Sequence, residues 1–193
     1  MEGTREHDTE TTEGEKQVIY GDGVRLRAVE KEDVPTFVRW FNDPELRSYI
    51  IMYRPISLAD EERWFEGLAD RKDDFVFAVE ALIDERWIHI GNVGLHNVDW
   101  KNSCCIFGIV LGEKQYWGQG YGTKTTKAVL RYAFEELNLH RVELEVYAYN
   151  TRAIRCYEKA GFRHEGTRRQ SRFHDGQYHD AHRMGILREE FEG

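Results

Sequence analysis

The chain has 193 residues, 40% of them hydrophobic and 32% charged, which is enough for one domain with a buried core. Its net charge of −8 argues against nucleic acid as a partner, because binding to phosphates needs clustered lysine and arginine. The three cysteines show no CxxC spacing, and no apolar run approaches the length of a membrane span. We therefore expect a cytoplasmic protein with no membrane segment and no disulfide framework.

The first part of the chain differs in composition from the rest. Residues 1–17 carry six acidic and two basic side chains and show no apolar period. We expect this segment to be a disordered acidic tail. Residues 18–193 are then expected to form a single domain.

The domain begins with one predicted strand and two predicted helices. Apolar and polar residues alternate over residues 24–29, which indicates a strand. An apolar face over residues 31–42 predicts a helix that ends before Pro44. Ser57 is suited to cap a second helix. The apolar stripe of that helix consists of Leu58, Trp64, Phe65 and Leu68.

The remaining pattern predicts a mixed sheet. Three strands over residues 75–82, 87–98 and 104–111, joined by polar turns, indicate an antiparallel meander. They are followed by a helix from residues 118–122 to about 137, a strand over 140–146, a helix over 150–160, and strands over 162–173 and 178–187. The hairpin signal Asp175-Gly176 joins the last two strands. We predict an α/β (α+β) fold with a mixed, mostly antiparallel sheet of about seven strands flanked by helices.

The most informative segment is Gln115-Tyr-Trp-Gly-Gln-Gly-Tyr-Gly-Thr123, between a hydrophobic strand and the long helix. Its three alternate glycines let the backbone approach a ligand closely. The first amides of the following helix have no intrahelical partner and lie at the positive end of the helix dipole, which suits a pyrophosphate. The segment has neither the Gly-Lys-Ser/Thr ending of a P-loop nor the spacing of a dinucleotide fingerprint.

A second segment is Asn150-Thr-Arg-Ala-Ile-Arg-Cys-Tyr-Glu-Lys-Ala-Gly-Phe162, in which Asn150 is suited to cap a helix and Tyr157 to pack it. Together the motifs Gln115-x-x-Gly118-x-Gly120 and Asn150-x6-Tyr157-x3-Gly-Phe resemble those of the GNAT superfamily of N-acetyltransferases. The late segments Asn138-Leu139, Glu165-Gly166, Asp175-Gly-Gln-Tyr178 and Arg183-Met184 look like the branch that contains spermidine and ribosomal-protein N-acetyltransferases.

The resemblance implies a GNAT fold, acetyl-CoA as co-substrate, no metal, and direct transfer of the acetyl group to an amine. It implies that Tyr157 gives a proton to the leaving thiolate. The implied cofactor-binding residues are Val110, Leu111, Gln115, Trp117, Gly118, Gln119, Gly120, Tyr121, Gly122, Thr123 and Asn150. The strand 107–111 is expected to splay from its neighbour, and Tyr49, Tyr53 and Arg54 are expected to line the acceptor side.

The general base is not evident from the sequence. Many members of the branch carry a glutamate where this chain has Ile106, which cannot accept a proton. The base then lies elsewhere or acts through water. The candidates are Glu80, His96 and Glu145, and we take Glu145 as the catalytic base, with Tyr157 as the acid. Each candidate is also consistent with a solvated or ion-paired side chain.

The acceptor is left open by the sequence. A polyamine, an amino sugar or aminoglycoside, and a protein N-terminus are all primary amines that fit. Polyamines suit the acidic balance, whereas the apolar run of residues 49–55, which includes Arg54, argues against spermidine. The alternative is a non-catalytic acyl-CoA sensor of the same fold, favoured by Ile106 and opposed by Tyr157. A homodimer is also left open, and His179 and His182 are expected to point to opposite faces of a strand rather than bind a metal.

Overall fold

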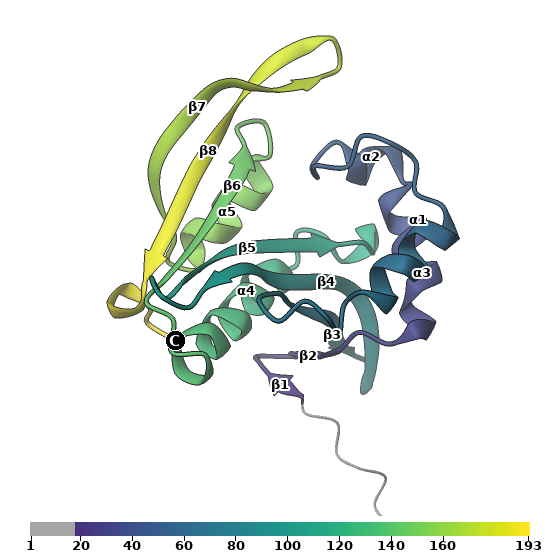
Figure 1. Ribbon diagram of the computed structural model, residues 1–193, viewed down its shortest axis with the longest axis horizontal. Helices are drawn as coiled ribbons and strands as arrows, with labels where there is room; N and C mark the ends of the chain where they lie inside the picture. The colour runs from purple at the N-terminus through teal and green to yellow at the C-terminus, as the bar shows by residue number, and fades with distance from the viewer. Residues whose placement is uncertain (1–17) are drawn as a thin grey trace, which may run out of the picture.

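The structure is a computed structural model that describes residues 18–193; the predicted acidic tail at residues 1–17 lies outside the described residues. Within the described range, eight strands form one sheet in the order β1-β2-β3-β4-β5-β6-β8-β7 (Figure 1). Every neighbouring pair is antiparallel except β5 and β6, which are parallel. The predicted mixed, mostly antiparallel sheet is confirmed, with β1 (Ile19–Tyr20) as an additional strand too short for a periodic signal.

The N-terminal elements follow the predicted order. They are β2 (Val24–Ala28), α1 (Val34–Phe41), α2 (Pro44–Arg47), α3 (Leu58–Glu66), β3 (Phe75–Ile83), β4 (Arg86–Asp99) and β5 (Cys104–Leu111). The Ser57 hydroxyl accepts a hydrogen bond from the amide of Asp60 at 3.1 Å and caps α3, as predicted. The short helix α2 was not predicted. Pro44 was expected only to end the preceding helix, but it also begins a new one. The carboxylate of Asp43 accepts from the amides of Glu45 and Leu46 and thereby starts this helix.

The C-terminal elements also follow the prediction. They are α4 (Tyr121–Arg131), which continues as a π-helical turn over Tyr132–Glu136, β6 (Arg141–Tyr147), α5 (Thr151–Lys159), β7 (Arg163–His174) and β8 (Gln177–Leu187). Asp175 and Gly176 have φ values of 49° and 75°, the left-handed conformations of a tight hairpin turn. β7 and β8 extend beyond the rest of the sheet as a long hairpin (Figure 1).

Two hydrophobic clusters cover opposite faces of the sheet. Neighbouring residues of β3 belong to different clusters: Ala78 belongs to the cluster that contains Phe37 and Trp40 of α1, whereas Val79 belongs to the cluster that contains residues of α4 and α5. Adjacent side chains of a strand point to opposite faces, so α1 and α3 cover one face and α4 and α5 cover the other. The core therefore fixes both sets of helices relative to the central strands.

The central strands β5 and β6 separate along their length. Their parallel pairing is limited to Cys104–Ile106 opposite Arg141–Glu143. Beyond these positions β5 runs on to Leu111 and β6 to Tyr147 without pairing to each other. The splay expected for the strand 107–111 is confirmed, and it opens the sheet in the middle.

Candidate active site

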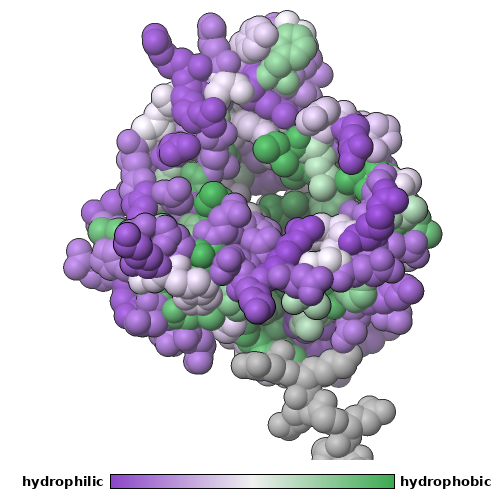
Figure 2. All heavy atoms as spheres, in the orientation of Figure 1, coloured by the Kyte–Doolittle hydropathy of each residue, from purple (hydrophilic) through white to green (hydrophobic). Residues whose placement is uncertain are grey.

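A cavity of about 1180 Å³ lies where β5 and β6 separate. Residues of β4, β5, β6, the glycine loop, α3, α5 and the segment after α2 line it. Figure 2 shows a hollow in the middle of this face, with hydrophobic residues inside it. The cavity exceeds the roughly 300–1,000 Å³ of ordinary small-molecule sites, so it has room for two reactants.

One end of the cavity has the geometry of an anion site. Gly118 and Gly120 have φ values of 76° and 89°, and at either position a Cβ atom would meet no other atom within 4 Å. Left-handed backbone, rather than crowding, is therefore what requires glycine there. No side chain caps α4, and its first hydrogen bond within the described chain runs from the amide of Lys124 to Gly120. The preceding amides remain available to a ligand.

The wall beside this end is cationic. Arg152, Arg155 and Lys159 of α5 line the cavity. The Arg152 guanidinium lies 3.7 Å from the centre of the Trp117 ring and 5.4 Å from that of Tyr49. Basic side chains near free amides favour a ligand that carries several phosphate charges.

Most predicted cofactor-binding residues line the cavity. They are Val110, Leu111, Trp117, Gly118, Gly120, Gly122, Thr123 and Asn150. The Asn150 side chain also accepts from the amide of Ala153 at 3.2 Å, so it caps α5 as predicted. Three predicted residues do not line the cavity: Gln115, Gln119 and Tyr121. The Gln119 amide donates to the Gln115 carbonyl at 2.7 Å, and this hydrogen bond belongs to the frame of the loop.

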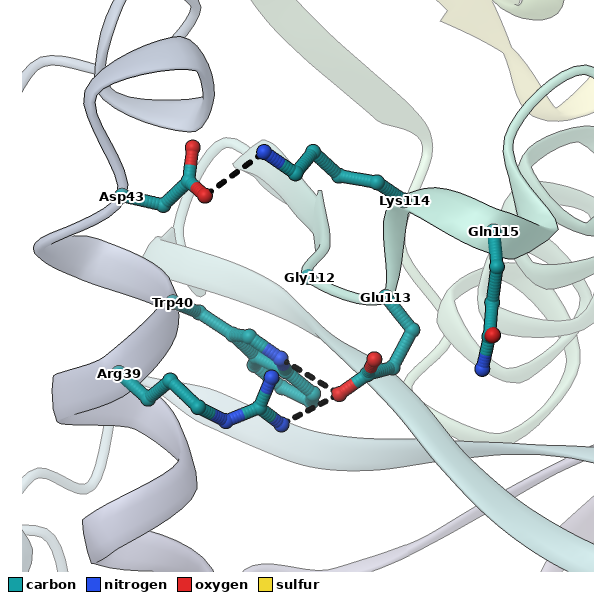
Figure 3. A pocket seen from close by; sticks show the side chains of 7 residues that line it. All are labelled: Arg39, Trp40, Asp43, Gly112, Glu113, Lys114 and Gln115. Atoms are coloured by element: carbon teal, nitrogen blue, oxygen red, sulfur yellow. Dashed lines mark hydrogen bonds and ion pairs between the residues drawn. The ribbon is translucent and has the colours of Figure 1, made fainter.

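A smaller pocket of about 190 Å³ lies beside the start of the loop (Figure 3). There Glu113 accepts from the Trp40 indole at 2.9 Å and from Arg39, and the Lys114 ammonium lies 2.8 Å from Asp43. A Cβ on Gly112 would stand 1.9 Å from the Trp40 ring, so only glycine fits against α1. These paired charges and close contacts anchor the loop to α1 and α2.

Tyr157 lies deep in the cavity wall. Its ring packs edge-on against Phe107 and Phe162, with centroids 5.8 and 5.9 Å away. Its hydroxyl has no hydrogen-bond partner among the described residues. Burial raises the pKa of the phenol well above its usual range, so the hydroxyl stays protonated at neutral pH and can donate.

The three predicted base candidates occupy different environments. Glu145 lines the cavity, but its carboxylate lies 2.7 Å from the Arg168 guanidinium. His96 also lines the cavity, with its ring 3.6 Å from Asp74. Glu80 does not line it and lies 2.5 and 2.8 Å from Arg25 and Arg27.

Glu80 is therefore a structural ion pair. Burial alone would raise the pKa of this carboxyl, but hydrogen bonds from the two arginines outweigh burial and lower it. The sequence could not reveal these partners, because they lie on another strand, β2.

Sequence reasoning missed the cations of α5 and also a buried carboxylate of the cavity. Glu61 of α3 lines the cavity, is only 4% exposed, and has no ion pair or side-chain hydrogen bond among the described residues. Burial, followed by repulsion from Asp60, raises the pKa of its carboxyl to about 7. It stands three and four residues before Trp64 and Phe65, within the apolar stripe of the helix. A carboxylate in an apolar stripe was the signal that could have found it.

The other end of the cavity is formed by the segment that follows α2. Tyr49, Tyr53 and Arg54 line it, together with the apolar residues between them. Arg172 of β7 donates to the Ile50 carbonyl at 3.1 Å, and the Tyr149 hydroxyl donates to the Ser48 carbonyl at 2.5 Å. The hairpin side of the molecule thus holds this segment over the cavity.

The histidines of the C-terminal hairpin lie in separate environments. His179 packs against Tyr149, whereas His182 contacts His164 and Thr167. No group of three or more His, Cys, Asp or Glu in residues 18–193 is arranged to hold a metal ion. No helix in the same range is long and apolar enough to cross a membrane.

Comparison with known proteins agrees with this geometry. The family described as "Acetyltransferase (GNAT) domain" matches residues 24–163. The chain is 35% identical over 174 residues to the SPbeta prophage-derived uncharacterized N-acetyltransferase YokL of Bacillus subtilis, covering 89% of this chain and 94% of that protein. It is 28% identical over 166 residues to the spermidine N(1)-acetyltransferase of Vibrio cholerae, covering 86% and 94%.

The solved structure of spermidine N-acetyltransferase from Vibrio cholerae in complex with CoA and spermine is similar throughout. Its TM-score is 0.81 at 27% identity, over 89% of this chain and 99% of that chain. The chain belongs to the GNAT acetyltransferase family. It is an N-acetyltransferase that uses acetyl-CoA as acetyl donor.

The cavity fits acetyl-CoA. The free amides at the start of α4 and the cations of α5 suit its phosphates. The gap between β5 and β6 leaves strand edges unpaired, so an extended amide-containing arm can bind them as a strand would.

Proposed function

We propose that the protein transfers the acetyl group of acetyl-CoA directly to the primary amine of a small molecule, within the cavity between β5 and β6. The observation that carries this proposal is that one cavity joins two unlike ends. Free amides and cations form one end, and the segment of Tyr49, Tyr53 and Arg54 forms the other. The donor and the acceptor can therefore meet at the middle of β5.

The backbone of β5 supplies the donor for the developing oxyanion. The Gly112 amide donates to the Ile90 carbonyl of β4, and the Leu111 carbonyl accepts from the Trp117 indole at 2.7 Å. Successive peptide groups of a strand point to opposite edges, so the Leu111 amide is directed away from β4, toward the gap. Of Val110 and Leu111, we thus propose Leu111 as the oxyanion donor.

Tyr157 is the proposed proton donor to the leaving thiolate. Its phenol is buried, protonated at neutral pH and without a partner among the described residues. The thiol of Cys156 supports direct transfer rather than transfer through an acetylated cysteine. Of the three cysteines, Cys156 is the one that lines the cavity. Burial raises the pKa of this thiol despite its hydrogen bonds with Thr123 and Thr126, so it is a poor acetyl carrier.

The acceptor end favours an amine with an apolar body. Ile51 and Tyr53 are 77% and 83% exposed, and Arg54 adds a positive charge beside them. An acceptor with charges along its whole length would meet Arg54 unfavourably, whereas an aliphatic or aromatic amine would cover the apolar side chains. The polyamines of the Vibrio cholerae relative are the natural comparison.

Release of free CoA thiol from acetyl-CoA tests this function. We expect release with primary amines of aliphatic or aromatic character, and none with their N,N-dimethyl counterparts, which cannot form a neutral amide. Release that is equal with and without amine would mean hydrolysis, and would contradict the proposal. A panel that includes spermidine, an amino sugar and a short peptide identifies the acceptor class.

Self-association is proposed separately. One structure of the Vibrio cholerae spermidine N-acetyltransferase is described as dodecameric, and a homodimer of this chain is the simplest assembly of that kind. Light scattering after size-exclusion chromatography tests it, and a monomeric mass at assay concentration would contradict it.

A further inference from the structure

The cavity contains a carboxylate for which neither the fold nor the ion pairs of the protein give a reason. Glu61 stands on the inner face of α3, and it is 4% exposed. The neighbouring Asp60 accepts from the Ser57 hydroxyl and from Arg63, so its carboxylate is engaged in the helix cap. Glu61 has no such partner in the described chain.

The surroundings of Glu61 are apolar and face β5. Trp64 and Phe65, one turn further along α3, pack in the same cluster as Val76 and Val110. Glu61 therefore lines the cavity from the helix that covers the β5 segment next to Leu111. A charge buried against apolar groups without a partner is strongly unfavourable, and a cation from the ligand would relieve it.

The reaction brings such a cation. An alkyl amine has a pKa of roughly 10 and enters the site as an ammonium ion, which must lose a proton before its nitrogen can attack. We propose that Glu61 is the carboxylate that binds the ammonium group of the acceptor and takes its proton. This inference rests on the proposed acetyl transfer to a primary amine.

Protons and bonds balance across the transfer. The ammonium gives one proton to the Glu61 carboxylate, and the neutral nitrogen forms its bond to the thioester carbonyl carbon. The carbon–sulfur bond breaks, and Tyr157 protonates the thiolate. The second proton of the nitrogen returns to Tyr157 through solvent, and the proton on Glu61 leaves to water.

The ionisation of Glu61 suits this task. Burial and repulsion from Asp60 raise the pKa of its carboxyl to about 7, and a general base is most effective when its pKa lies near the working pH. α1 packs on α3 and carries one charge, Arg39, which is paired with Glu113. The charged groups and the histidine on the remaining walls are Arg54, His96, Glu145, Arg152, Arg155 and Lys159. The phenols and the thiol on those walls belong to Tyr49, Tyr53, Tyr147, Tyr157 and Cys156.

The test is the pH profile of kcat/KM for the acceptor, measured at saturating acetyl-CoA. Wild type should show a rising limb with a midpoint near 7, and Glu61→Gln should lose the limb and about 10²–10⁴-fold in rate above it. Acetyl-CoA affinity, measured by calorimetry, should stay unchanged. Glu66→Gln makes the same change on an exposed position of α3 and should behave as wild type.

Several outcomes would overturn the inference. The inference is wrong if Glu61→Gln keeps both the rising limb of the pH profile and the wild-type rate. It is also wrong if the limb disappears in Glu145→Gln or in His96→Gln instead. Equal loss of acetyl-CoA affinity would mean that Glu61 is structural. If Glu61→Gln folds poorly, Glu61→Asp takes its place in the test. This variant keeps the charge and should retain part of the rising limb. A wild type that turns over no amine would overturn the proposed function itself, and this inference with it.

Discussion

The buried Glu61 carboxylate should make the folded protein less stable as the pH rises. Its folded-state pKa of about 7 lies above the ordinary value of 4.5. Below about pH 4.5 the group is protonated in both states and adds no penalty. Between about pH 4.5 and 7 the folded state binds the proton more tightly than the unfolded state, so stability falls with pH. The rise in pKa corresponds to about 3 kcal/mol.

Glu61→Gln removes this ionisation while keeping the shape of the side chain. The difference in the free energy of unfolding between the variant and wild type should therefore grow by up to about 3 kcal/mol between about pH 4.5 and 8, in favour of the variant. Urea-induced unfolding at a series of pH values measures it. Glu66→Gln, on the exposed side of α3, is the control and should show no such trend.

A difference that does not change with pH would refute the reasoning. It would mean that the Glu61 carboxylate is solvated or paired in the folded protein, which would also weaken its proposed role with the acceptor. A variant more stable at alkaline pH but slower in transfer is the expected combination, because a site residue is often kept at the expense of stability.

The remaining predictions concern the donor, the acid and the acceptor. Gly120→Val should weaken acetyl-CoA binding by about tenfold or more in a folded protein, because valine does not adopt φ 89°; unchanged affinity in calorimetry would contradict this. Tyr157→Phe should lower kcat about 10²–10⁴-fold without changing acetyl-CoA affinity. If the variant has the wild-type kcat while the chemical step limits the rate, Tyr157 has only a packing role. Tyr53→Ala and Arg54→Ala should raise the acceptor KM by about three- to tenfold, whereas equal damage to acetyl-CoA binding would mark the segment as structural.

The order of the elements could be predicted because each long segment has a clear period or boundary. The hairpin turn at Asp175-Gly176 and the cap at Ser57 depend only on neighbouring residues, and both were predicted correctly. The four-residue helix α2 and the two-residue strand β1 are too short to show a period. The π-helical turn over Tyr132–Glu136 also leaves no pattern in the sequence.

The site was predictable only in part, because its geometry depends on residues far apart in the chain. The glycine loop is local, and its backbone conformation follows from its glycines. Arg27 lies 53 residues from Glu80 and Arg168 lies 23 residues from Glu145, and no local pattern connects either pair. For Glu61, the sequence shows a carboxylate on an apolar stripe of a helix. It does not show that this carboxylate has no partner among the described residues.

The central claim is direct acetyl transfer from acetyl-CoA to a primary amine in this cavity. Acetyl-CoA that carries a deuterium-labelled acetyl group tests it, with mass spectrometry of both the amine product and the intact protein. We predict one labelled acetamide for each CoA thiol released and no label on the protein, Cys156 included. Thiol release without a labelled amide, or label retained on Cys156 before the amine is added, would contradict the account.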